Sequence, residues 1–62
     1  MMRLKELRLQ KRASRKQVAE AIGYSMQAYT HYEKGRREPN IATLKSLSKY
    51  FGVSIDFIVC ND

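Results

Sequence analysis

The 62-residue sequence has neither the cysteine pairs of disulfides nor the long apolar runs of membrane spans. Its single cysteine, Cys60, cannot form an internal disulfide, which fits a reducing compartment. We expect Cys60 to act as a small apolar residue and not as a redox switch. No stretch approaches the roughly 18 consecutive apolar residues of a membrane span, and no apolar run near Met1 marks a secretory signal. We therefore expect a cytoplasmic chain without a membrane partner.

The side-chain sets of an enzyme are also missing. The sequence has one histidine, His31, and no nucleophile–base set, carboxylate pair or phosphate-cradling loop. A metal site at His31 is not expected, because no second histidine, cysteine or carboxylate follows three or four residues later. The sequence predicts a protein that is not an enzyme and uses no cofactor or metal.

Acidic residues are scarce, 6 against 12 lysines and arginines, so the net charge is +6. The cations gather in two groups, one near the start and one in the middle of the chain. The groups are Arg3, Lys5, Arg8, Lys11, Arg12, Arg15 and Lys16, then Lys34, Arg36 and Arg37. Such patches favour a polyanionic partner. On charge alone an ordinary solvated helix surface fits equally well, and an anionic membrane surface fits less well, because a core pattern uses the apolar residues.

Glycine is sparse too, and its three occurrences divide the chain. Gly23, Gly35 and Gly52 each follow an apolar-periodic segment, where a helix ends in the left-handed conformation. Residues that cap helix N-termini stand at the expected starts. These caps are Ser14 (with Gln17 in a capping box), Ser25, Asn40 and Ser54.

Apolar residues recur at helical spacing, and no period-two run predicts a strand. The expected helices span residues 2–12, 15–22, 26–34, 41–51 and 55–60. The residues expected to face the core are Leu4, Leu7, Val18, Ala19, Ile22, Tyr24, Tyr29, Tyr32, Ile41, Leu44, Leu47, Phe51, Ile55, Ile58 and Val59. The sequence predicts one compact all-α domain of five helices over residues 1–62.

The second and third expected helices, residues 15–34, have the form of a helix-turn-helix. They are joined by Gly23-Tyr24-Ser25, and the glycine permits a sharp turn. Ala19 fits this motif because a larger side chain at its inward position would push the two helices apart. Ala19 and Gly23 are therefore expected to be structural residues.

The third helix, residues 26–34, has one continuous outward face. Met26, Gln27, Thr30 and His31 lie on it. Gln27 can read adenine with two hydrogen bonds, Thr30 and His31 can bond base edges, and Met26 can touch a thymine methyl group. The alternative is a plain solvent face, but such faces usually favour Lys and Glu. The motif therefore favours base reading.

From about Arg3 to Val59 the sequence resembles the phage repressor and Cro-type helix-turn-helix family, also called the XRE family. The residues that support the resemblance are Leu7-Arg8, Val18-Ala19, Gly23, Tyr32-Glu33-Lys34-Gly35, Pro39, Leu44, Leu47 and Phe51-Gly52-Val53-Ser54-Ile55-Asp56. The resemblance implies a five-helix lambda-repressor-like fold, operator DNA as partner, commonly a symmetric homodimer, and a structural ion pair between Arg8 and Glu33.

The expected phosphate contacts lie on either side of the reading helix. They are Arg15, Lys16, Gln17, Ser25, Lys34, Arg36 and Arg37. The sequence departs from the family pattern at Arg15, where a phosphate-gripping glutamine is usual, and arginine brings more charge with less fixed geometry. Three tyrosines also replace the usual aliphatic residues.

The C-terminal residues Phe57, Ile58 and Val59 cannot all face one small core, so we expect a homodimer contact there. We expect no ligand-binding or oligomerisation domain and therefore no small-molecule ligand. The resemblance implies a prokaryotic or phage-encoded repressor that is nucleoid-associated when bound. An antitoxin or protein-interaction module with the same fold remains the alternative.

Overall fold

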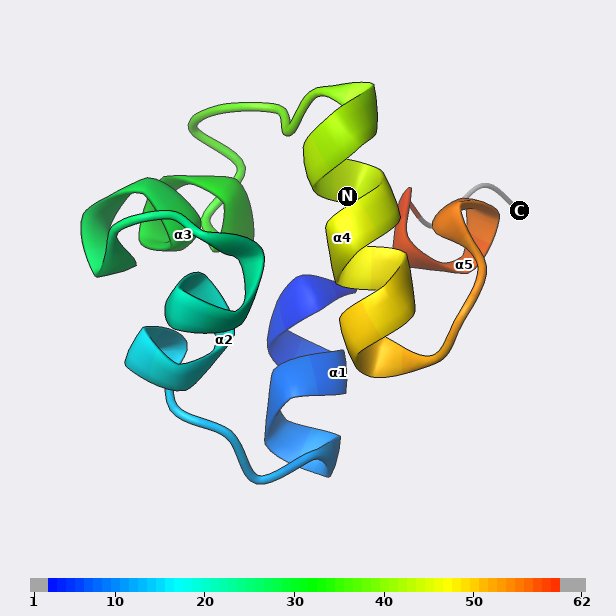
Figure 1. The fold of residues 1–62 in the computed structure, drawn as a ribbon, viewed down its shortest axis with the longest axis horizontal. Helices are drawn as coiled ribbons and strands as arrows, with labels where there is room; N and C mark the ends of the chain where they lie inside the picture. The colour runs from blue at the N-terminus through cyan, green and yellow to red at the C-terminus, as the bar shows by residue number, and fades with distance from the viewer. Residues whose placement is uncertain (1–2, 60–62) are drawn as a thin grey trace.

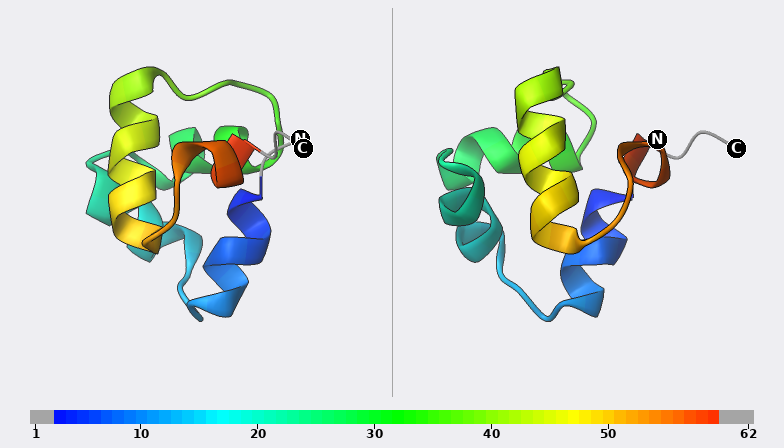
Figure 2. Two further views of the ribbon diagram at one scale, coloured as in Figure 1. Left: turned by 90° about the vertical axis from the view of Figure 1, so that its right-hand side faces the viewer. Right: turned by 45° about the vertical axis from the view of Figure 1, so that its right-hand side comes forward.

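Five helices make up all regular structure in residues 3–59, the residues that the computed structural model describes. They are α1 (Leu4–Gln10), α2 (Arg15–Ile22), α3 (Met26–Glu33), α4 (Ile41–Phe51) and α5 (Ile55–Val59). Figures 1 and 2 show α2 and α3 together on one side of the molecule, α4 beside them, and α5 at the opposite edge. The all-α prediction is confirmed; Cys60, with its expected role, lies outside the described residues.

Four of the helices begin at N-terminal side-chain caps, at the residues that the sequence predicts. In the capping box of α2, the Gln17 backbone N–H donates to Ser14 Oγ at 3.0 Å and the Ser14 N–H donates to Gln17 Oε1 at 2.8 Å. Such caps satisfy N–H groups that have no partner within the helix. The equivalent caps of α3, α4 and α5 are Ser25, Asn40 and Ser54.

The end of α1 differs from the prediction, which extended this helix to residue 12. The helix stops at Gln10, and Arg12 adopts a left-handed φ of 57° without being a glycine. The Arg12 N–H donates to Leu9 O at 3.0 Å and the Ala13 N–H donates to Arg8 O at 3.1 Å, which closes the helix in the manner of a Schellman motif. No glycine marks this end, so the sequence pattern does not predict it.

The core lies where all five helices meet. Tyr29, Leu4, Leu47 and Ile58 are fully buried there. Ile41, which the spacing assigned to the core, is instead 67% exposed. It lies two residues before the buried Thr43, which is about 200° around the helix, and so it points away from the core.

Tyr24 spans the turn between α2 and α3 rather than entering the core. Its side chain is partly exposed, and its ring meets the Tyr32 ring edge-on with centroids 5.9 Å apart. The Thr43 hydroxyl donates to the Tyr24 hydroxyl oxygen at 2.7 Å. The turn is thereby tied to α4, which holds the α2–α3 pair against the rest of the domain.

Candidate nucleic-acid interface

Helix α3 has one buried face and one exposed face. Tyr29 and Tyr32, on the inner face, are 0% and 7% exposed. On the other face Met26 is 51% exposed and Gln27 is also exposed. Because residues at i, i+3 and i+4 share a helix face, the buried tyrosines fix which side chains point outward. The four residues predicted to read bases thus lie together on the exposed side, with two of them only partly exposed.

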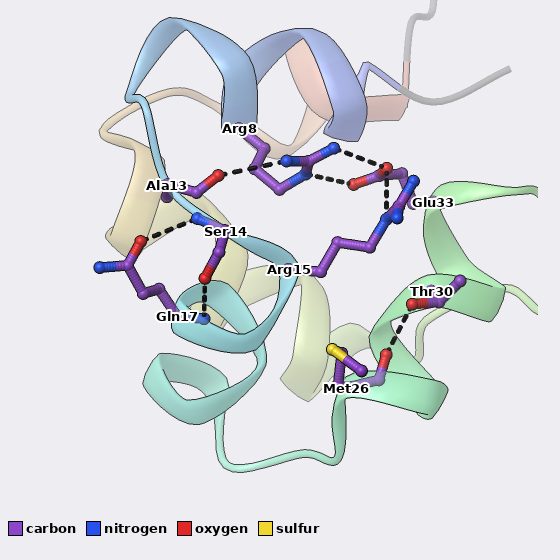
Figure 3. A network of polar contacts seen from close by, with 8 residues as sticks. All are labelled: Arg8, Ala13, Ser14, Arg15, Gln17, Met26, Thr30 and Glu33. Atoms are coloured by element: carbon purple, nitrogen blue, oxygen red, sulfur yellow. Dashed lines mark hydrogen bonds and ion pairs between the residues drawn. The ribbon is translucent and has the colours of Figure 1, made fainter.

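Those two, Thr30 and His31, have restricted hydrogen-bonding capacity. The Thr30 hydroxyl donates to the Met26 carbonyl oxygen at 2.8 Å (Figure 3). Its oxygen can therefore accept a further hydrogen bond but has no second hydrogen to donate. The Nδ1 atom of His31 is buried without a partner among residues 3–59, so an external group can be met only by Nε2.

The ion pair implied by the family resemblance joins α1 to the end of α3. Arg8 Nε donates to Glu33 Oε2 at 2.8 Å and Arg8 Nη2 donates to Glu33 Oε1 at 3.2 Å, a two-pronged arrangement. The third nitrogen, Nη1, donates to the Ala13 carbonyl at 3.2 Å. The two side chains are 11% and 2% exposed, so the pair is mostly removed from water.

The surroundings of this pair shift three ionisation equilibria. Burial alone would raise the pKa of Glu33, but hydrogen bonds from Arg8 lead the opposing effects, and the net pKa is lowered. The hydrogen bond to Glu33 raises the pKa of Arg8 despite its burial. Burial, followed by the nearby Glu33 carboxylate, raises the pKa of the Tyr29 hydroxyl. All three groups therefore keep their ordinary charge states at neutral pH.

Arg15 joins the same carboxylate, which sequence reasoning did not anticipate. Its Nε donates to Glu33 Oε1 at 3.2 Å, and its side chain remains 40% exposed. Figure 3 shows Arg15 reaching from the start of α2 toward the Arg8–Glu33 pair. The two residues are 18 positions apart, so their meeting depends on how α2 packs against α3 and leaves no local sequence signal.

The other predicted phosphate contacts fall into exposed cations and capping residues. Lys16, Lys34, Arg36 and Arg37 are exposed. Ser25 and Gln17 use an oxygen atom in a helix cap, but the Ser25 hydroxyl hydrogen and the Gln17 amide NH₂ can still donate to a ligand. The turn after α3 folds back on it, because the Arg36 N–H donates to the His31 carbonyl at 2.9 Å.

The predicted dimer residues do not share one environment. Phe57 is 45% exposed, with the Arg3 guanidinium carbon 4.6 Å from its ring centroid, and Val59 is partly exposed. Ile58 is fully buried, so its assignment to a contact surface is wrong. Adjacent helical residues point about 100° apart, which turns Ile58 into the core while Phe57 faces outward.

Three further features of the described residues concern metal binding, membrane spanning and the shape of the surface. In residues 3–59 no group of three or more His, Cys, Asp or Glu side chains could hold a metal ion. None of the helices in this part of the chain is long and apolar enough to cross a membrane. A hollow of about 400 Å³ lies beside the turn after α3, and its lining includes Leu44, Pro39 and Val59.

Comparison with known proteins gives one family match and several relatives. A family model described as "Helix-turn-helix" matches residues 4–58. The chain is 42% identical over 57 residues to YonR, a SPbeta prophage-derived uncharacterized HTH-type transcriptional regulator of Bacillus subtilis (strain 168). That match covers 92% of this chain and 53% of the relative. No solved structure matches.

Two other relatives have names that specify opposite effects on transcription. The cryptic phage CTXphi transcriptional repressor RstR of Vibrio cholerae is 33% identical over 57 residues, covering 92% of this chain and 51% of the relative. The HTH-type transcriptional activator BcrR of Enterococcus faecalis is 35% identical over 60 residues, covering 97% and 29%. The chain thus spans about half the length of YonR and RstR, and less of BcrR.

Proposed function

Because the chain belongs to the XRE-type helix-turn-helix family, we propose that it binds a specific double-stranded DNA site and regulates transcription as a repressor. The observation that supports this best is the division of α3 into two faces. One face is held by buried tyrosines and an ion pair. The other presents hydrogen-bonding and apolar groups in place of the lysines and glutamates of an ordinary solvated face.

In this proposal α3 enters the major groove with its first turn nearest the base edges. Gln27, which is exposed in that turn, pairs with adenine through its amide oxygen and nitrogen. Met26 lies beside it and contacts a thymine methyl group. His31 and Thr30 lie one turn further along the helix. Both side chains are partly buried, so they extend a shorter distance toward the base edges.

Phosphates on either side of the groove are gripped by residues that precede and follow the reading face. The net charge of +6 favours this, because each phosphate that is neutralised releases condensed counterions. The proposed contacts are Arg15, Lys16, Gln17, Ser25, Lys34, Arg36 and Arg37.

We further propose that the protein acts as a homodimer on a palindromic operator. Phe57 and Val59 present apolar surface at the edge of the domain, and Val59 also borders the hollow that Leu44 and Pro39 line. Joining two copies there would place two reading helices about 34 Å apart, one turn of DNA.

The experiment that tests the function is selection of bound sequences from random duplex DNA. We expect enrichment of two inverted half-sites, and repression when the selected site overlaps a promoter in a transcription assay. Binding without any enriched sequence would contradict specific recognition, and the protein-interaction alternative would then be preferred. Activation in place of repression would overturn only the sign of regulation.

The dimer has its own test, with a matched pair of neutral substitutions. Phe57→Gln should lower operator affinity at low protein concentration and shift sedimentation toward the monomer, without altering the charge that attracts DNA. Leu9→Gln replaces a comparably exposed apolar residue, 56% exposed on α1, and should change neither result. A wild-type protein that sediments as a monomer both free and on DNA would contradict the dimer.

A further inference from the structure

We propose that Glu33 is a positioning residue for the DNA contact of Arg15, so that one buried carboxylate serves both the fold and the grip on phosphate. This rests on the proposed DNA-binding function. It differs from the Arg8–Glu33 pair, because it concerns the second arginine on the same carboxylate, at the position where this chain departs from the family pattern.

The charges around Glu33 do not balance within residues 3–59. Two guanidinium groups, those of Arg8 and Arg15, donate to one carboxylate. Arg8 is 11% exposed and uses Nε and both Nη atoms, whereas Arg15 is 40% exposed and uses only Nε among the described residues. One positive charge is therefore uncompensated, and the more exposed arginine presents it to solvent.

A phosphate fits the free side of Arg15. The guanidinium is a planar fork, and fixing Nε against Glu33 leaves the two Nη groups to donate as a pair to phosphate oxygens. Glu33 is itself held by Arg8, and its side chain is only 2% exposed, so it is a rigid support. Figure 3 shows this order, from Arg8 through Glu33 to Arg15 at the start of α2. Restricting Arg15 in advance removes part of the ordering cost of binding.

The link can be tested in the free protein, without DNA. Hydrogen exchange of the arginine Nε–H groups by NMR should show Arg15 protected at least about tenfold relative to Arg36, an exposed arginine whose side chain has no hydrogen-bond partner within residues 3–59. Equal exchange for the two arginines would overturn the positioning, whether or not the protein binds DNA.

The consequence for binding is tested by Arg15→Lys, which keeps the charge but has no fork. In the wild type this change should weaken binding to the selected site by about tenfold, because a charge-assisted pair of hydrogen bonds is lost. Arg36→Lys should cost distinctly less, because that cation has no carboxylate to aim it. The salt slope of log affinity should stay nearly constant in both variants.

The dependence on Glu33 is tested by repeating Arg15→Lys in a variant that lacks both Glu33 and Arg8. Removing both leaves no unpaired buried charge. In the Arg8→Gln/Glu33→Gln double variant, checked for folding by circular dichroism at low temperature, Arg15→Lys should cost less than about threefold. An equal cost in both backgrounds would show that Arg15 acts independently of Glu33. If the double variant does not fold, the exchange measurement on the wild type decides. Failure of the wild type to bind any duplex would instead refute the proposed function, and the exchange result would still report the link.

Discussion

The two faces of α3 show how one eight-residue helix separates stability from recognition. The inner face has Tyr29 at 0% exposure and Glu33 held by two arginines, so it is packed inside the domain and removed from solvent. The outer face leaves the apolar Met26 and the amide of Gln27 exposed to solvent. Substitutions on the inner face should therefore mainly change the free energy of unfolding, and at Glu33 also the phosphate contact of Arg15. Substitutions on the outer face should change which DNA is bound.

The largest expected effect comes from removing Arg8, the α1 residue that binds Glu33 on the inner face of α3. Arg8→Ala leaves the Glu33 carboxylate with only the weaker support of Arg15, and should cost about 3–5 kcal/mol of folding stability. Thermal and urea unfolding measure this, with Lys5→Ala, an exposed change on the same helix, as the control expected to stay within about 0.5 kcal/mol. A cost below about 1 kcal/mol for Arg8→Ala would mean that both groups are well solvated.

The ion pair of Glu33 on this inner face should also affect the free energy of unfolding at acidic pH. Because the pKa of folded Glu33 lies below its ordinary value of 4.5, the ionised pair stabilises the protein above that pH. This stabilisation is lost as the pH falls through the lower, folded-state pKa. Glu33→Gln should flatten the decline of unfolding free energy below pH 4.5 by up to about 1.4 kcal/mol per pH unit. Glu20→Gln, an exposed change on α2, should follow the wild-type profile, and identical profiles for all three proteins would contradict the coupling.

A smaller effect is expected at Arg12, which belongs to neither face of α3. Its left-handed φ of 57° is costly for a residue with a Cβ atom, so Arg12→Gly should raise stability by about 0.5 kcal/mol. Lys11→Gly is the contrasting change, because Lys11 has a right-handed φ of −81° and its ammonium lies 4.9 Å from the Tyr50 ring centroid, so glycine there should destabilise by at least a similar amount. Chemical denaturation distinguishes the two. A loss of stability in Arg12→Gly would show that the side chain contributes more than the backbone strain.

Helical periodicity predicted most of the division between buried and exposed helix faces. The spacing of Val18, Ile22, Tyr29 and Tyr32 decides which sides of α2 and α3 are buried. The capping residues and glycines predicted four of the helix starts and three of the ends. The Arg8–Glu33 pair came from the family resemblance, since two charged residues 25 positions apart have no local signal.

The remaining errors have a common physical cause. Apolar character indicates burial only when the residue also lies on the correct side of its helix, and this failed for the exposed Ile41. Ile58 is buried as its spacing predicts, and only its assignment to the dimer contact failed. Thr43 is buried beside Tyr24 because packing, rather than polarity, decides its position. Arg15 meets Glu33 only after α2 and α3 are assembled. Contacts that form only when the helices pack together cannot be predicted from the sequence pattern.

Base reading by the outer face of α3 is tested by Gln27→Ala, with binding measured on every single-base variant of the selected site. We expect a loss of about 1–3 kcal/mol in discrimination at one base position of each half-site. Non-specific affinity and the unfolding temperature should stay unchanged, and Gln10→Ala, the same change on an exposed site of α1, should alter none of the three. If Gln27→Ala binds with the same affinity and the same base preferences as the wild type, the outer face of α3 does not read DNA.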